Sequence, residues 1–247
     1  MNSVLKKIGI LLVFVLLTTK GVFGEDALEI IKKLDKVMYP NAKSEILLIF
    51  NKKDGKEERY KLISYSKDLN QKTIVRFAEP ASMIGNDIIL LEKNVWQKDS
   101  NAGRIIKIPS NLSFGGTGFS YGDVVRLNLS DNYAAEITSE DNDKWLINLT
   151  AKDRNAPYFR IELEVKKVLF VPIKSTCYGK NNKVIKYIEY SDLKSFNNVE
   201  KPTKFVVKSP LDPKETSTMI YTSEVKKDYP DRIFNKNNLD MRQEENY

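Results

Sequence analysis

Apolar and polar side chains alternate without a fault over residues 159–166, which read Phe159-Arg160-Ile161-Glu162-Leu163-Glu164-Val165-Lys166. Successive side chains of a β-strand point to opposite faces of its sheet, so this strand has one apolar face and one polar, solvent-exposed face. Antiparallel sheets tolerate a solvated face, whereas strands of parallel sheets are buried on both faces. The stretch therefore predicts an antiparallel sheet.

Strand-like runs fill most of the chain on both sides of this stretch. Residues 43–52 and 57–67 are joined by Lys53-Asp54-Gly55-Lys56, and Asp-Gly between two such runs is a strong hairpin signal. Further runs cover residues 72–77, 87–91, 94–98, 104–108, 133–138, 144–151, 159–166, 169–178, 183–191, 204–209 and 216–225. Their short spacing favours an antiparallel meander within one domain, residues 25–239.

Helical patterns are limited to the two ends of this domain. Apolar residues recur at helical spacing in residues 27–38, which predicts one amphipathic helix that ends at Tyr39-Pro40-Asn41. A short helix is expected over residues 231–239. The polar tail, residues 240–247, is expected to fray.

The first 24 residues have the three parts of a secretory signal. Two lysines precede an apolar run from Ile8 to Leu17, and small residues lie near the end of the segment. A membrane-spanning helix needs about 20 apolar residues, roughly twice the length of this run. We therefore expect cleavage after Gly24 and export to the periplasm.

Cleavage would remove three lysines and no acid, which lowers the formal net charge from +7 to +4. The remaining lysines are spread among Asp and Glu, without the basic clusters that are typical of a nucleic-acid-binding protein. The sequence therefore predicts no nucleic-acid partner.

The composition also argues against most catalytic chemistry. The chain has no histidine, the commonest general base and transition-metal ligand. Its one cysteine, Cys177, lies in a strand-like run, which favours a buried apolar role over a free thiol. The densest acidic cluster, residues 140–143, lacks the ligand spacing of a calcium loop and fits a hairpin turn better. We expect no enzyme, no metal and no cofactor.

One segment interrupts the meander. Residues 109–123 read Pro-Ser-Asn-Leu-Ser-Phe-Gly-Gly-Thr-Gly-Phe-Ser-Tyr-Gly-Asp, with four glycines and three aromatic residues. Glycines allow tight bends, and the rings of Phe114, Phe119 and Tyr121 can cover an apolar opening. A movable cover and a plain surface connection are both compatible with this composition. Few helices remain to cover the sheet, so a cavity competes with a filled sandwich core.

The block from Phe77 to Val124 resembles the LolA-like family of outer-membrane lipoprotein-sorting proteins. The resemblance rests on residues 77–80 (Phe-Ala-Glu-Pro), Gly85 before the apolar run 88–91, Trp96, the run 104–108 (Arg-Ile-Ile-Lys-Ile) and the glycine-rich residues 114–123. The chain departs from the family pattern at Gly118 and Gly122, where acidic residues are expected, and at residues 97–100.

The resemblance implies a mainly β fold with a few helices: an open antiparallel half-barrel of about eleven strands, in which a helical lid covers a hydrophobic cavity. It implies a monomeric periplasmic carrier that binds the acyl chains of a lipoprotein or lipid. An inner-membrane donor transporter would load it, and an outer-membrane acceptor would unload it. The alternative is a lipid-binding accessory protein of an envelope lipid transporter.

Nine residues make up the predicted lipid-binding set. Six strand residues are assigned to the concave face from within-strand alternation and the position of Trp96. These six are Phe77, Ile89, Leu91, Trp96, Ile106 and Ile108. Phe114, Phe119 and Tyr121 complete the set as rings of the cover.

Overall fold

The computed structural model describes residues 26–246, and the predicted signal peptide lies outside them. The described residues form one antiparallel sheet of thirteen strands. The strands are β1 (Ala42–Asn51), β2 (Glu57–Lys67), β3 (Lys72–Glu79), β4 (Ile88–Leu91), β5 (Asn94–Asp99), β6 (Arg104–Ile108), β7 (Tyr133–Glu140), β8 (Lys144–Ala151), β9 (Arg160–Lys166), β10 (Val171–Tyr178), β11 (Val184–Phe196), β12 (Val199–Ser209) and β13 (Asp212–Lys226).

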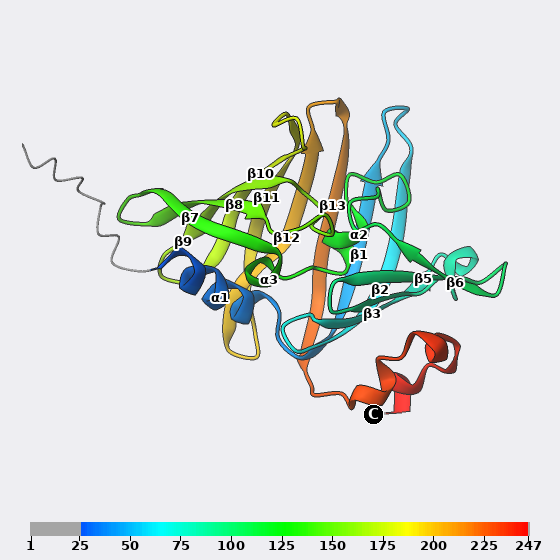
Figure 1. Ribbon diagram of the computed structural model, residues 1–247. Coiled ribbons are helices and arrows are strands. Elements are labelled where there is room, and N and C mark those ends of the chain that lie inside the picture. Colours follow the sequence, from blue (N-terminus) through cyan, green and yellow to red (C-terminus); the bar gives the residue numbers. More distant parts are fainter. Residues whose placement is uncertain (1–25, 247) are drawn as a thin grey trace, which may run out of the picture.

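The chain enters this sheet in the middle and leaves it in the middle. The strand order is β6-β5-β4-β3-β2-β1-β13-β12-β11-β10-β9-β8-β7, so the meander runs to one edge, crosses over, and returns from the other edge. The last strand pairs with the first, with Ala42 opposite Lys226. β6 and β7 do not pair with each other, which leaves the curled sheet open (Figure 1). The predicted mainly β, open antiparallel class is confirmed, with thirteen strands rather than about eleven.

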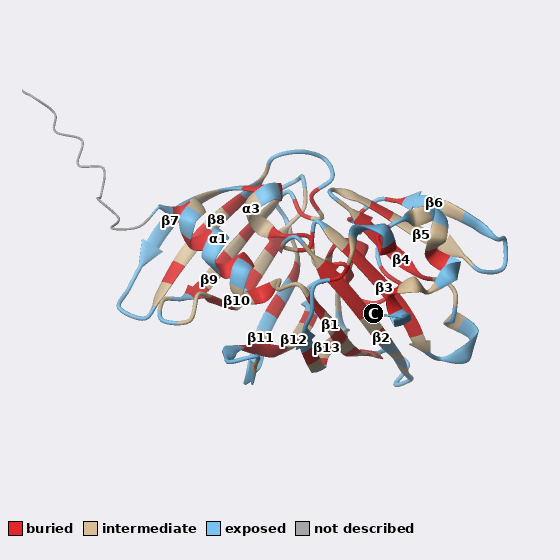
Figure 2. Cartoon of the chain, turned by 90° about the horizontal axis from the view of Figure 1, so that it is seen from below, coloured by how far each residue is buried: buried red, intermediate tan, exposed pale blue. Residues whose placement is uncertain are grey.

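The helix α1 (Ala27–Met38) covers part of the concave face. The Asp26 carboxylate caps its first turn by accepting a hydrogen bond from the Leu28 N–H. Its apolar side packs against β7, β10 and β12. Figure 2 shows the helix lying over the half of the sheet that contains β7 to β10. The segment 109–132, which connects β6 to β7 and is called the crossover here, includes the short helices α2 (Tyr121–Val124) and α3 (Leu129–Asn132).

Two apolar clusters lie on opposite faces of the sheet. The larger one fills the concave side beneath α1 and the crossover. The smaller one lies on the outer side of β2 to β5, where three 3₁₀ helices cover it: η2 (Asp231–Ile233), η3 (Lys236–Met241) and η4 (Gln243–Asn246). One further 3₁₀ helix, η1 (Ala81–Met83), follows β3. Because β4 is buried on both faces, its sequence is the unbroken apolar run Ile-Ile-Leu-Leu.

The C-terminal segment is therefore attached to the sheet rather than free. Glu244 is buried and forms an ion pair with Arg76 of β3, which also pairs with Asp87 and donates to the Leu239 carbonyl. Figure 1 shows this segment in red below β3. The expectation that the tail from residue 240 frays is wrong for residues 240–246, because burial of a charged side chain requires a fixed partner.

Candidate functional site

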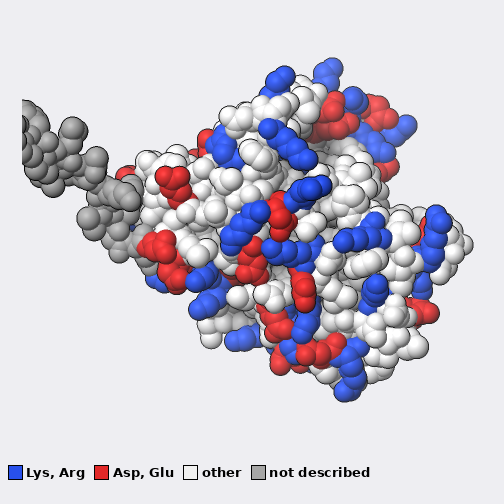
Figure 3. Space-filling model, viewed as in Figure 1, with Lys and Arg blue, Asp and Glu red and all other residues white. Residues whose placement is uncertain are grey.

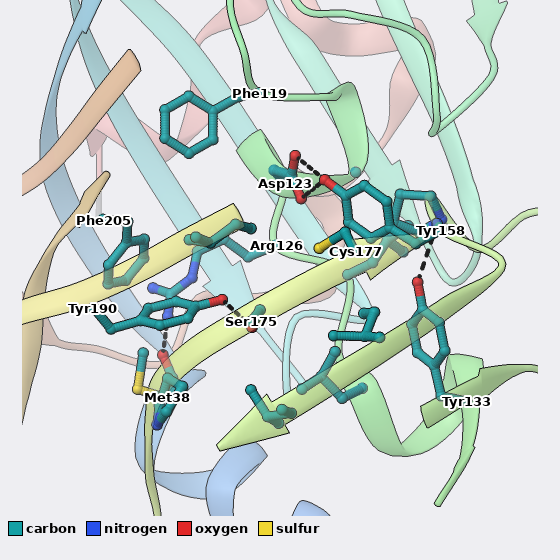
Figure 4. Close-up of a pocket in the computed structure, with 18 of the residues that line it drawn as sticks. Met38, Phe119, Asp123, Arg126, Tyr133, Tyr158, Ser175, Cys177, Tyr190 and Phe205 are labelled. Atoms are coloured by element: carbon teal, nitrogen blue, oxygen red, sulfur yellow. Dashed lines mark hydrogen bonds between the residues drawn. The ribbon is translucent and has the colours of Figure 1, made fainter. Parts of the chain in front are cut away.

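A cavity of about 90 Å³ lies between the concave face and its cover. α1 contributes Leu34 and Met38 to its wall, while β9 contributes Ile161 and Leu163. The crossover contributes Phe119 and two charged residues, Asp123 and Arg126, as Figure 4 shows. The alternation in residues 159–166 explains the apolar wall, because Ile161 and Leu163 share the inner face of their strand.

Asp123 provides one polar point of this wall. It occupies the N3 position of α2, where it forms a capping box with Ser120. Its carboxylate accepts hydrogen bonds from the Tyr158 hydroxyl at 2.6 Å and from Lys186 Nζ at 3.2 Å. Lys186 Nζ also donates to the Gly118 carbonyl at 2.6 Å. The charges of Asp123 and Lys186 thus compensate each other, and Tyr158 and the Gly118 carbonyl provide further hydrogen bonds.

Arg126 provides a second polar point, at the end of the cavity where α1 stops. Its guanidinium donates from Nη2 to the Met38 carbonyl at 2.7 Å. The guanidinium carbon lies 4.7 Å from the ring centre of Tyr39, 4.6 Å from that of Tyr221 and 5.7 Å from that of Phe205. Such distances are typical of cation–π contacts. Arg126 therefore joins the crossover to the last turn of α1.

A second contact between α1 and the crossover is made by Asp35. Its buried carboxylate accepts hydrogen bonds from the backbone N–H groups of Leu129 and Ser130, at 3.1 and 2.8 Å. These N–H groups belong to the first turn of α3, where a helix favours negative charge. Burial nevertheless raises the pKa of Asp35 to about 6, because these hydrogen bonds only partly compensate for lost solvation.

Cys177 lies in the wall as a fully buried side chain of β10, as expected from the sequence. Burial raises the pKa of its thiol well above the ordinary range. The hydroxyls of Ser175 and Tyr190 lie 3.1 Å apart beside it. The thiol is therefore not activated as a nucleophile, because burial favours its protonated form.

Four of the nine predicted residues belong to the concave cluster near the crossover: Phe77, Phe114, Phe119 and Tyr121. The rings of Phe77 and Phe114 stack at 5.8 Å, and Phe114 meets Tyr121 edge-on at 5.4 Å. The Tyr121 hydroxyl donates to Gln97 Oε1 at 2.6 Å. Of the nine, Phe119 alone lines the 90 Å³ cavity.

The other strand residues divide between the two faces. Ile108 belongs to the concave cluster, and Ile106 shares its face but is 38% exposed. Ile89, Leu91 and Trp96 lie in the outer cluster beneath the C-terminal segment, so their assignment to the concave face is wrong. Alternation determines which residues share a face but not which face is concave. For β4 and β5 the predicted concave residues are each one position away from the residues that face the concave side. Lipid binding by any of the nine stays a prediction.

The sequence reasoning missed Asp123, Arg126 and Tyr158. Arg126 and Tyr158 lie outside the block between Phe77 and Val124 that supplied the predicted set, with Tyr158 in the loop between β8 and β9. Asp123 lies inside that block, but the predicted set contained only apolar and aromatic residues. The alternating stretch at residues 159–166 was the available signal for this half of the wall.

The glycine-rich part of the crossover packs closely on the sheet. Gly116 has a φ of +76°, which favours glycine. The Gly118 N–H donates to Ser217 Oγ at 2.8 Å, and a Cβ at this position would lie 3.0 Å from Val207 Cγ1. Phe114 and Phe119 are each 2% exposed, so the rings cover the concave face. Movement of this cover stays a prediction.

Solved structures share this architecture. A LolA superfamily protein from Nitrosomonas europaea aligns with a TM-score of 0.79 and 24% identity, over 86% of this chain and 99% of that chain. A DUF1329 family protein from Desulfovibrio piger aligns at 0.76 and 19%, over 86% and 97%. An outer membrane lipoprotein-sorting protein domain from Vibrio parahaemolyticus, itself a provisional assignment, aligns at 0.74 and 14%, over 86% and 97%. The fold is therefore LolA-like, as the sequence resemblance implied.

The sequence itself places the chain in a family. A family model described as a "-like" uncharacterized protein matches residues 69–241, and the chain belongs to that family. A search of curated proteins finds no match. Within residues 26–246, no helix has both the length and the apolar composition needed to cross a membrane.

Proposed function

We propose that the chain is an exported periplasmic carrier that holds the acyl chains of lipoproteins in its cavity and delivers them toward the outer membrane. The apolar cavity between α1, the crossover and the concave face is the observation that carries this proposal. The LolA-like fold supports it, since one structural relative is described as a lipoprotein-sorting domain.

The energetics of such a carrier are those of solvent exclusion. Each methylene moved from water to an apolar site gains about 0.8 kcal/mol, so an acyl chain of roughly fifteen methylenes gains on the order of 12 kcal/mol. Reversible transfer then needs only a modest difference in affinity between donor, carrier and acceptor. No covalent step is required.

Loading requires the cover to move. The cavity of about 90 Å³ is smaller than the roughly 300–1,000 Å³ of most ligand pockets. The contacts of Asp35 with α3 and of Arg126 with the end of α1 join the two parts of the cover to each other. α1 and the crossover can therefore leave the strands as one unit, which would expose the apolar wall to cargo.

The first experiment identifies the cargo. Organic extracts of the protein purified from its native envelope are analysed by mass spectrometry beside the intact protein fraction. A co-purifying acylated polypeptide supports the lipoprotein carrier. Stoichiometric free lipid without such a polypeptide supports the alternative, an accessory protein of an envelope lipid transporter. Absence of both, together with no uptake of a fluorescent fatty acid, contradicts the proposal.

A second experiment tests the cavity directly with Cys177→Phe, which places a ring in the space that cargo would use. Thr176→Phe is the matched control, because the neighbouring side chain points to the outer face of the same strand. We expect fluorescent fatty acid binding to fall at least about tenfold in Cys177→Phe and to stay near the wild-type level in Thr176→Phe. Equal binding by both folded variants would place the acyl site elsewhere.

A further inference from the structure

The guanidinium of Arg126 is a cation in the wall of an otherwise mainly apolar cavity. Among residues 26–246, no carboxylate lies within ion-pair distance of it. A charge taken from water without a partner is costly, and proteins normally pair it. Burial lowers the pKa of Arg126, and Tyr221, Tyr39 and the more distant Glu224 raise it above its ordinary value overall, yet none of the groups in direct contact with the guanidinium is an anion.

Each carboxylate near this end of the cavity already has its own donors. Glu224 binds Lys201 Nζ at 2.6 and 2.8 Å. Asp35 accepts from the two backbone N–H groups of α3, and Asp123 accepts from Tyr158 and Lys186. The group formed by Arg126, Lys201 and Glu224 thus contains two cations and one anion.

The neighbouring lysine reports the same surplus of positive charge. Burial first, and then the charge of Arg126, lower the pKa of Lys201 to about 8 despite its ion pair with Glu224. An anion beside Arg126 would reduce this repulsion. It would also use further donors, because a guanidinium has five N–H groups, of which Arg126 gives one to the Met38 carbonyl and directs another toward the Tyr221 hydroxyl.

We propose that the acyl ligand carries an anionic group, a carboxylate or a phosphate, and that Arg126 binds this group at the end of the cavity beside the last turn of α1. The inference rests on the proposed function and makes the cargo more specific. The alkyl chain runs from Arg126 along Ile188, Leu163 and Ile161, which line the same cavity. The guanidinium suits this role because its fork matches the oxygens of carboxylate and phosphate.

The test compares ligands that share a chain and differ in charge. Palmitate is compared with methyl palmitate, and a lysophosphatidic acid with the monoacylglycerol of the same chain, by displacement of a fluorescent fatty acid below the critical micelle concentration. We expect the wild-type protein to bind at least one anionic member about tenfold or more tightly than its neutral partner. The pair that shows the larger ratio distinguishes carboxylate from phosphate.

Two variants assign the preference to Arg126. Arg126→Gln should bring the anionic-to-neutral ratio close to one without weakening the neutral ligands. Lys204→Gln, which removes a positive charge from the outer face of β12 beside Phe205, should keep the wild-type ratio. A preference that survives Arg126→Gln would overturn the assignment to Arg126.

The wild-type comparison decides the inference even if Arg126→Gln does not fold. Equal affinity for anionic and neutral ligands overturns the anionic cargo but leaves the acyl cavity supported. Failure to bind any of the four ligands contradicts the proposed function itself, so the two failures are distinguishable.

Discussion

Arg76 and Glu244, 168 positions apart in the sequence, form a buried ion pair on the outer face of the sheet, with Nε and Oε1 at 2.5 Å. The side chains are 3% and 1% exposed. This pair holds the C-terminal 3₁₀ helices over Ile74, Ile89 and Trp96. The end of the chain thus closes the second apolar face, which would otherwise be exposed to solvent.

Loss of Glu244 should destabilise the protein strongly. Glu244→Ala leaves Arg76 buried with less compensation, and breaking one partner of a buried pair costs about 3–5 kcal/mol. Glu245→Ala is the control, since Glu245 pairs with Arg242 at the surface and should cost less than about 1 kcal/mol. Urea unfolding measures both. If Glu244→Ala loses as little stability as Glu245→Ala, the C-terminal segment contributes little to the stability of the fold.

Asp35 should make stability depend on pH. Its pKa is about 6 in the folded protein against an ordinary 3.8, so the folded state holds the proton more tightly. Its contribution to stability is therefore complete below about pH 4 and is lost as the pH rises through about 6. The loss is on the order of 3 kcal/mol. Asp35→Asn should remove this component from a pH series of urea midpoints.

The control for this series is Glu29→Gln, on the exposed side of the same helix. It should keep the loss of stability between pH 4 and 6. A wild-type protein whose stability instead rises over this range, relative to Asp35→Asn, would show that the two α3 hydrogen bonds outweigh burial.

Trp96 should not report on bound cargo. It lies in the outer cluster, where Lys236 Nζ is 3.8 Å from its ring centre, and the sheet separates it from the cavity. In a Trp145→Phe background, where Trp96 is the one remaining tryptophan, brominated acyl chains should bind without quenching its fluorescence. Contact quenching of Trp96 would place the acyl chain on the outer face.

A disulfide can test whether the crossover must move. A Cβ at Gly118 would lie 3.5 Å from Ser217 Cβ, which is at the short end of disulfide geometry. Gly118→Cys with Ser217→Cys, in a Cys177→Ser background, should close this bond with a small shift of Val207. We expect lipid uptake from vesicles to slow at least about tenfold on oxidation and to recover on reduction.

The reduced form of the same protein is the control, because it has an identical sequence. Unchanged uptake after verified oxidation would mean that residues 114–119 stay in place and that α1 alone opens the cavity. The acyl cavity would then stand without its glycine-rich gate.

Local patterns were sufficient for the elements of this fold. Asp26 and Pro40 delimit α1, and Gly55, with a φ of +83°, makes the first hairpin turn as its sequence indicates. Unbroken alternation at residues 159–166 predicted a strand with an apolar inner face, and Ile161 and Leu163 do line the cavity. These features depend on near neighbours in the chain, whose geometry the residue types restrict directly.

The faces and the site depended on contacts between distant segments. Ile88 and Ile89 have the same chemistry, and their opposite positions follow only from the curl of the sheet and from the C-terminal segment that covers one side. Arg126 looks like an ordinary surface residue in sequence, yet the crossover places it beside Met38, Tyr39 and Tyr221. By itself the sequence determined the antiparallel strands, the first helix and the lack of histidine chemistry. Tertiary structure decided which side is concave and where a charge meets the cavity, because burial is a property of the packed chain.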